Sequence, residues 1–135
     1  MATHLWHATM ALRDYALTFP GAWEDFPWEE RVIKVGKKVF VFMGKVDSDG
    51  LSLGLCVKLP KSGPDVLLED YAEPGSYGTG KWGWVGVSFS GDDEPPLERI
   101  RSWIDESYRA VATKKLVKEL DERQARHILG SQGQL

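Results

Sequence analysis

The segment LSLGLCVKL, residues 51–59, alternates apolar with small or polar side chains along its whole length. Successive side chains of a β-strand point to opposite faces of a sheet, so this alternation predicts a strand with one buried and one open face. The side chains predicted to face the core are Leu51, Leu53, Leu55, Val57 and Leu59. Such a strand needs neighbouring strands and a second layer that covers its apolar face.

Further strand-like runs stand on both sides of this segment. ERVIKVG and KVFVFMG precede it and are joined by a tight turn at Gly36 and Lys37. A second turn is predicted at DSDG, residues 47–50, because Asp and Gly tolerate positive φ. WGWVGVSF, residues 82–89, alternates again and predicts another strand. Strands connected by such short turns pair antiparallel.

Helical periodicity occurs towards both ends of the chain. Apolar residues at three- and four-residue steps predict helices over residues 5–19, 97–111 and 116–129, with a short helix from Pro64 to Tyr71. Residues 19–30 are rich in Pro and Gly and predict an ordered loop without regular structure. We expect an α+β fold, a single compact domain over residues 1–129 whose antiparallel sheet is packed on one face by N- and C-terminal helices. Residues 130–135 are expected to form a disordered tail.

Composition limits the class of protein. The chain has 135 residues, of which 42% are hydrophobic and 27% charged, as in an ordinary globular domain. No apolar run approaches the roughly 20 residues that span a bilayer, and no basic cluster precedes an apolar stretch at the N-terminus. Cys56 is the single cysteine, which excludes an internal disulfide and a thiolate metal cluster. We expect a cytoplasmic protein without a membrane partner.

Charge alternates along the chain in blocks. The net charge is −3, yet residues 31–61 contain seven Lys or Arg against two Asp. Residues 62–98 contain one Lys against eight acids, and residues 99–135 contain eight bases against five acids. A general nucleic-acid binder usually has a basic excess over its whole domain. Binding of a polyanion would therefore require the two basic segments to share one face.

The stretch GSYGTGKWGW, residues 75–84, imitates two nucleotide-binding motifs, the P-loop and the dinucleotide fingerprint. Both motifs need a helix to begin after the glycines, because its N-terminus binds the phosphates. Here a strand is predicted to follow, and Trp82 stands where a P-loop has Ser or Thr. The favoured interpretation is structural: the glycines lead into a strand on which Trp82 and Trp84 pack over bare backbone, including Gly54.

No residue set predicts catalysis, a metal site or a cofactor. His4 and His7 lie three residues apart without a third ligand, which is a weak metal signal. Cys56 has no nearby His in the sequence and is interpreted as a small, half-buried residue. Acid pairs such as Asp92 and Asp93 fall in predicted loops. We expect a protein that is not an enzyme.

Three segments in this order resemble the MmcQ/YjbR family: ALRDYALTFPGAWEDFPWEERVIKVGKKVFVFM, KWGWVGVSF and WIDESYRAVATKKL, the last with its Ser107–Tyr108 pair. The resemblance runs from about residue 5 to residue 116. It implies a compact α+β domain related in topology to the frataxin-like CyaY proteins, and DNA binding through a double-wing motif. It implies no catalytic residues. The frataxin-like iron site uses an acidic ridge, and since the first helix here has only Asp14, no iron site is carried over.

The basic residues of the central hairpin are the main candidates for function. If the hairpin projects as a wing, its ammonium groups can contact the phosphates of double-stranded DNA. The candidates are Lys34, Lys37, Lys38, Lys45, Lys58, Lys61, Lys114 and Lys115. The same lysines can equally form a solvated face that keeps a sheet edge from pairing. The alternative function is a non-enzymatic module that binds a small ligand or protein through Trp23, Trp28, Trp82 and Trp84.

Overall fold

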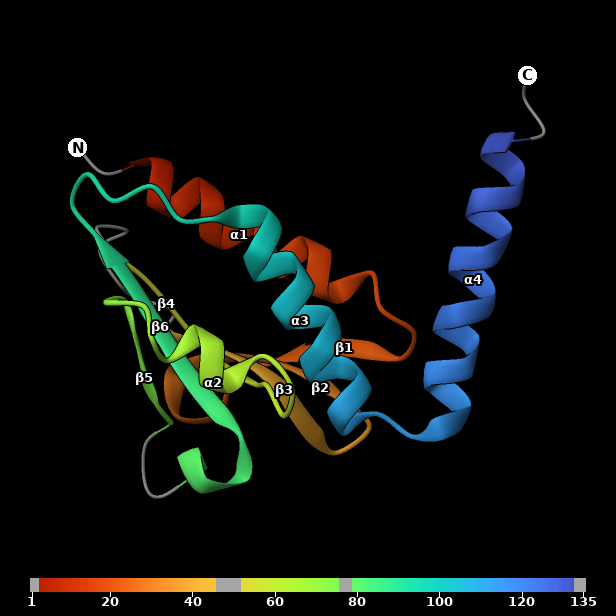
Figure 1. Cartoon of the computed structure of the whole chain (residues 1–135), viewed down its shortest axis with the longest axis horizontal. Helices are drawn as coiled ribbons and strands as arrows, with labels where there is room; N and C mark the ends of the chain where they lie inside the picture. Colours follow the sequence, from red (N-terminus) through yellow and green to blue (C-terminus); the bar gives the residue numbers. More distant parts are fainter. Residues whose placement is uncertain (1–2, 46–51, 76–78, 133–135) are drawn as a thin grey trace.

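The computed structural model describes residues 3–45, 52–75 and 79–132, except for the side chains of Thr3, Lys45 and residues 128–132. It forms one sheet flanked by helices (Figure 1). In chain order the elements are α1 (Thr3–Leu17), β1 (Ala22–Asp25), the 3-10 helix η1 (Pro27–Glu29), β2 (Glu30–Val35), β3 (Lys38–Lys45), β4 (Ser52–Lys58), α2 (Gly63–Val66), β5 (Ala72–Pro74), the 3-10 helix η2 (Thr79–Trp82), β6 (Trp84–Ser90), α3 (Leu97–Val111) and α4 (Lys114–Gln132).

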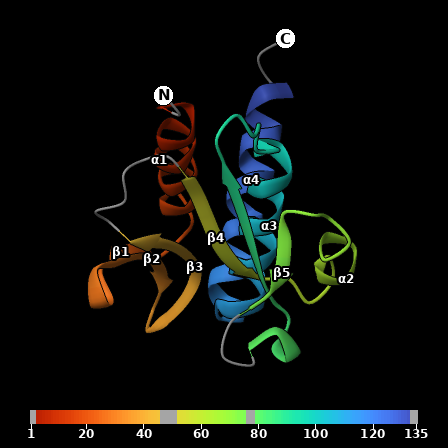
Figure 2. The same ribbon diagram turned by 90° about the vertical axis from the view of Figure 1, so that its left-hand side faces the viewer.

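The described strands pair antiparallel throughout, in the order β1-β2-β3-β4-β6-β5. α1 and α3 pack against one face, and in Figure 2 the strands stand in front of them. Leu53, Leu55 and Val57 of β4 face these helices and are buried, as the alternation predicts. The predicted α+β fold is therefore confirmed. Leu51 and the predicted turn at residues 47–50 lie outside the described residues.

α1 buries one face against the sheet. Leu5, Ala8, Leu12 and Ala16 recur at helical spacing and are all buried. Each leucine contributes roughly 1.5–3 kcal/mol by leaving water. The helix ends before Pro20, and Gly21 adopts a φ of 71°, which turns the chain back into β1.

α3 and α4 are consecutive helices that diverge. α3 buries Ile100, Ile104 and Tyr108, and it ends because Ala112 is extended, with ψ of 159°. α4 buries Leu120, while the described side chains at 121–127 are exposed and the helix leads away from the sheet (Figure 1). It continues to Gln132, so the predicted domain boundary at residue 129 falls inside a helix. Neither α4 nor any other helix within the described ranges has the length and apolar character of a bilayer-spanning segment.

The prediction of an irregular loop over residues 19–30 is wrong in part. Ala22–Asp25 form the edge strand β1, in which Trp23 lies opposite Lys34 of β2. A strand of four residues is too short to show clear alternation, and the flanking Pro and Gly residues suggest a loop. η1 follows, and there Trp28 and Glu29 have positive φ values of 55° and 63°.

The region between β4 and β6 also differs from the sequence prediction. α2 ends at Val66 instead of near Tyr71, and Ala72–Pro74 pair with β6 as β5. Trp82 ends η2 and is 65% exposed, so it does not share a strand with Trp84. Gly54 lies opposite Ser88 of β6. The predicted packing of both tryptophans over Gly54 is therefore wrong.

Candidate functional site

The turn between β2 and β3 presents two lysines at the surface. Gly36 closes this turn with a φ of 63°, and Lys37 and Lys38 follow it as exposed residues. Neither ammonium group forms an ion pair with another residue of the described ranges. Both charges are therefore free to meet an anion from outside.

Lys34 is different from its neighbours on the hairpin. Its Nζ lies 2.8 Å from Asp25 Oδ2 and sits 5.1 Å from the centre of the Trp23 ring. The hydrogen bond from Lys34, together with one from the Phe26 backbone, lowers the pKa of Asp25. Lys34 thus joins β1 to β2, and its charge is already matched.

Ser107 of α3 lies between β3 and β4 where their pairing ends. The two strands pair at Val41–Val57 and Phe42–Cys56, which puts Phe40 opposite Lys58 at the next position. There the Ser107 hydroxyl donates to the Phe40 carbonyl oxygen at 2.6 Å and accepts the Lys58 backbone N–H at 2.9 Å. It bridges two groups that a continuing ladder would join directly.

A bulge in β3 reinforces this separation. Ile33 lies opposite Val41 and Lys34 opposite Val39, so Phe40 is the extra residue of β3. The bulge turns both Phe40 and Val41 into the core, where each is fully buried. The pairing of β3 with β4 therefore ends next to Lys58, and Lys38 lies two residues before Phe40 on the separated part of β3.

A pocket of about 430 Å³ opens beside this separation. Phe42 and Trp84 are its aromatic walls, with ring centres 5.4 Å apart and planes at 68°, and Phe42 is 37% exposed. Its two cations come from different strands. The residues that line this β3–β4 pocket are Lys38, Val39, Phe42, Lys58, Trp84, Ala110 and Val111.

The remaining candidate lysines whose side chains are described do not line the pocket. Lys61 is exposed and follows β4. Its backbone N–H and that of Ser62 are held by Glu106 Oε2, at 2.9 and 3.0 Å. Burial disfavours the charge of Glu106, but the hydrogen bonds from Ser62 and Lys61 outweigh it and lower the pKa of Glu106.

Only some of the candidate lysines therefore lie close together in the structure. Lys38 and Lys58 share the pocket, and Lys37 adjoins Lys38 on the turn. Lys114 and Lys115 are exposed at the start of α4, shortly after Val111. The side chain of Lys45 lies outside the described part of the chain.

The four candidate tryptophans lie on four different elements. Trp23 on β1 is engaged, because its indole N–H donates to the Gly36 carbonyl oxygen at 2.9 Å. Trp28 on η1 is 93% exposed, and Trp82 on η2 lies beneath the Lys81 ammonium. Only Trp84 lines the pocket. Its partner Phe42 was not a candidate, although its place beside the core residue Val41 in KVFVFMG could have marked it as a residue of the opposite face.

The glycine-rich stretch belongs to a hairpin connection. β5 precedes it, η2 and β6 follow, and residues 76–78 lie outside the described residues. A Cβ added to Gly75 would lie 2.8 Å from Trp84 Cβ, and one added to Gly80 would lie 2.7 Å from Pro74 Cβ. These glycines are needed for close backbone packing, which agrees with the structural interpretation of the stretch.

The chemically reactive side chains are used in other ways. His4 contacts the Asp93 carbonyl oxygen through Nε2 at 2.9 Å. Burial raises the pKa of Cys56 to about 11. Across the described ranges, no three His, Cys, Asp or Glu side chains are grouped in a way that could hold a metal ion.

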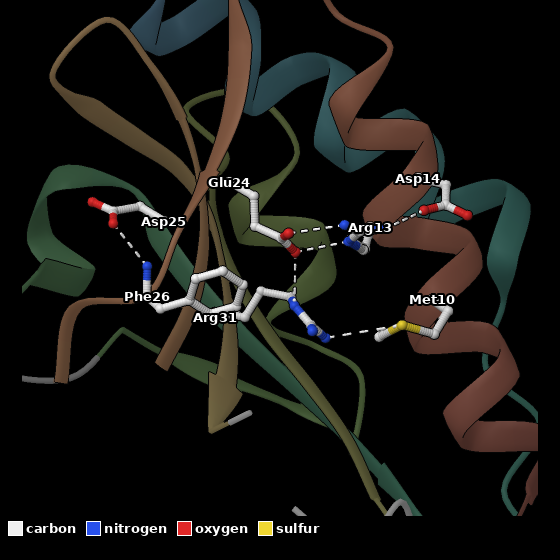
Figure 3. Close-up of polar contacts among 7 residues, drawn as sticks. All are labelled: Met10, Arg13, Asp14, Glu24, Asp25, Phe26 and Arg31. Carbon is white, nitrogen blue, oxygen red and sulfur yellow. Dashed lines mark hydrogen bonds and ion pairs between the residues drawn. The ribbon is translucent and has the colours of Figure 1, made fainter. Parts of the chain in front are cut away.

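A charged cluster on the helix side of β1 is structural (Figure 3). Glu24 Oε2 and Oε1 accept from Nε and Nη2 of Arg13 at 2.7 and 2.8 Å, and Arg31 Nε lies 2.8 Å from Glu24 Oε2. Hydrogen bonding to Arg13 is the main cause that lowers the pKa of Glu24. The cluster fastens α1 to β1 and β2, and its charges are internally matched.

Fold and pocket together define a small α+β domain with one antiparallel sheet and a basic, aromatic opening beside its central hairpin. A family model described as YjbR matches residues 17–110, and the chain belongs to this family. The crystal structure of Deinococcus radiodurans protein DR2400, with domain DUF419, is similar at 28% identity and a TM-score of 0.64. The alignment covers 82% of this chain and 85% of that chain. No curated protein matches.

Proposed function

We propose that this protein binds DNA through Lys37, Lys38 and Lys58. The observation that carries the proposal is that Lys38 and Lys58, from different strands, line one pocket while neither forms an ion pair among the described residues. Lysine ammonium groups contact phosphate oxygens and supply the sequence-independent part of DNA affinity. The resemblance of the family to double-wing DNA-binding proteins supports the same assignment.

The number of unpaired lysines determines the expected affinity for DNA. Lys34 is paired with Asp25, so it adds little. Three phosphate contacts predict a slope of about −3 for log affinity against log salt, and the net charge of −3 opposes tight binding. We therefore expect weak binding that salt abolishes.

A salt titration tests this function. Anisotropy of a short labelled duplex would be measured between about 50 and 200 mM salt. Lys38→Gln and Lys58→Gln are each expected to reduce the salt slope by about 1. Lys81→Gln is the control, because Lys81 is exposed but lies over Trp82, outside the pocket. If the wild type binds neither the duplex nor a single strand of the same length at the lowest salt concentration, the proposal is rejected.

The alternative, a module that uses the tryptophans as one ligand surface, has less support. Trp23 is held by Gly36 and Lys34, and Trp28 and Trp82 lie on other elements outside the pocket. The part of this alternative that keeps support is Trp84 with Phe42. These rings line the same pocket as Lys38 and Lys58. They are therefore relevant to whether the protein prefers single-stranded or double-stranded DNA.

A further inference from the structure

We infer that the β3–β4 pocket receives an unpaired nucleobase of single-stranded DNA, an assignment that rests on the proposed DNA binding. The pocket combines two chemistries that a nucleotide also combines. Phe42 and Trp84 offer aromatic surface to a flat base, and Lys38 and Lys58 offer charge to its phosphates. Single-strand-binding sites use this combination of stacking rings and a cationic groove.

The aromatic walls are open to a ligand. Phe42 is 37% exposed although it lies in the middle strands of the sheet, where a large apolar side chain is normally covered. Towards β6 it pairs with Cys56, and Cys56 pairs with Gly86, so its neighbours on that side are small; on the other side it pairs with the buried Val32. Of the described helices, α3 lines the pocket with Ala110 and Val111 alone, and the Phe42 ring stays partly exposed.

Duplex DNA cannot use these walls without distortion. Its bases are stacked inside the double helix, and turning one out costs a few kcal/mol for unstacking and unpairing. The bases of a single strand are available without that cost. A short footprint is also expected, because Glu73 on the neighbouring strand β5 is exposed and repels phosphates beyond Trp84.

Two residues of α3 keep the pocket open, Ser107 from beside it and Ala110 from within its wall. Ser107 keeps Phe40 and Lys58 apart, and Ala110 contributes only a methyl group to the wall nearest α3. A larger side chain at position 110 would occupy the space assigned to the base. Because Ala110 is exposed near the end of α3, this change need not disturb the core.

The experiment compares three labelled ligands of matched length: a single strand, its duplex, and an abasic strand that has the phosphates without the bases. Stacking of one base is expected to make the single strand bind about tenfold more tightly than the abasic strand. It should also bind more tightly than the duplex. The indole N–H resonance of Trp84, identified through Trp84→Phe, should shift when the single strand binds.

Two substitutions separate the pocket from the lysines. Ala110→Leu and Phe42→Leu should each remove the advantage of the single strand over the abasic strand and leave the salt slope unchanged. Ala125→Leu and Trp28→Leu are the matched controls, since they alter an exposed helical alanine and an exposed aromatic ring outside the pocket. Both controls should bind like the wild type.

The outcomes are distinguishable. If no DNA binds at low salt, the proposed DNA-binding function fails and this inference fails with it. If the single strand, the abasic strand and the duplex bind equally, the base pocket is overturned while DNA binding stands. The pocket is also overturned if Trp84 does not shift, or if Ala110→Leu leaves the preference for bases intact.

Discussion

The Tyr108 hydroxyl donates a hydrogen bond of 2.7 Å to the carbonyl oxygen of Pro20. Tyr108 is fully buried, and its ring lies against Phe19 and Phe40, with centres 4.9 and 5.3 Å away. The bond fastens the last turn of α3 to the turn between α1 and β1. It gives one half of the Ser107–Tyr108 pair a physical role.

Tyr108→Phe is expected to lower the free energy of unfolding by about 1–2 kcal/mol, because it leaves the buried Pro20 carbonyl without a partner while keeping the ring. Urea denaturation measures this. Tyr71→Phe is the control, since the Tyr71 hydroxyl only accepts a bond from the exposed Arg99, and its removal should cost less than about 0.5 kcal/mol. Equal losses in both variants would contradict the role of the Tyr108 bond.

Ser107→Ala is expected to destabilise the protein by about 1–3 kcal/mol, because two backbone groups lose their shared partner. The Lys58 amide should also exchange with solvent faster, since its hydrogen bond ends at Ser107 Oγ. NMR measures the exchange rate of the Lys58 amide individually. Ser102→Ala, on the same helix, removes an exposed hydroxyl bonded to Arg99 and should leave Lys58 unchanged. Unaltered exchange at Lys58 in Ser107→Ala would refute the bridge.

The sequence predicted those strands and helices in which burial against a neighbouring layer sets a regular spacing of apolar residues. β4 is recognisable because Leu53, Leu55 and Val57 face a helical layer and their neighbours do not. α3 is recognisable for the same reason at helical spacing. β1 was missed because an edge strand of four residues buries too little to impose a pattern.

The candidate site depended on contacts between distant residues, which a sequence pattern does not contain. Lys34 and Lys38 are the same residue type on the same hairpin. Only the fold brings Asp25 to Lys34 and leaves Lys38 unpaired within the described ranges. Ser107 lies 49 positions from Lys58 and 67 positions from Phe40, the two residues that it bridges. The pocket takes its lining from β3, β4, β6 and α3, so its residues could not be grouped from spacing alone.

Glu24→Gln tests the charged cluster on the helix side of β1. Glu24 is 15% exposed and serves both Arg13 and Arg31, so its loss should cost about 2 kcal/mol at neutral pH, between values for surface and buried pairs. Arg13 lowers the pKa of Glu24 below its ordinary value of 4.5. The stabilisation is therefore complete above pH 4.5 and is lost as the pH falls through the lowered pKa.

Thermal unfolding of both proteins as a function of pH checks this dependence. The gap in stability between wild type and Glu24→Gln should be constant near neutrality and should narrow only in acid. Asp14→Asn is the control, because Asp14 also contacts Arg13 but is 67% exposed, and it should change stability by less than about 0.5 kcal/mol. A gap that widened in acid would show that the sign is wrong.

Cys56 is expected to react slowly with thiol reagents in the folded protein. Burial raises the pKa of its thiol to about 11, so the reactive thiolate is scarce at pH 8. Relative to a cysteine with the ordinary pKa of 9.0, labelling by iodoacetamide should be roughly a hundredfold slower. The same reaction in guanidinium chloride is the control, because unfolding restores the ordinary pKa. If labelling is equally fast in both conditions, Cys56 is not shielded, and the row of Phe42, Cys56 and Gly86 is more open to solvent than its burial indicates.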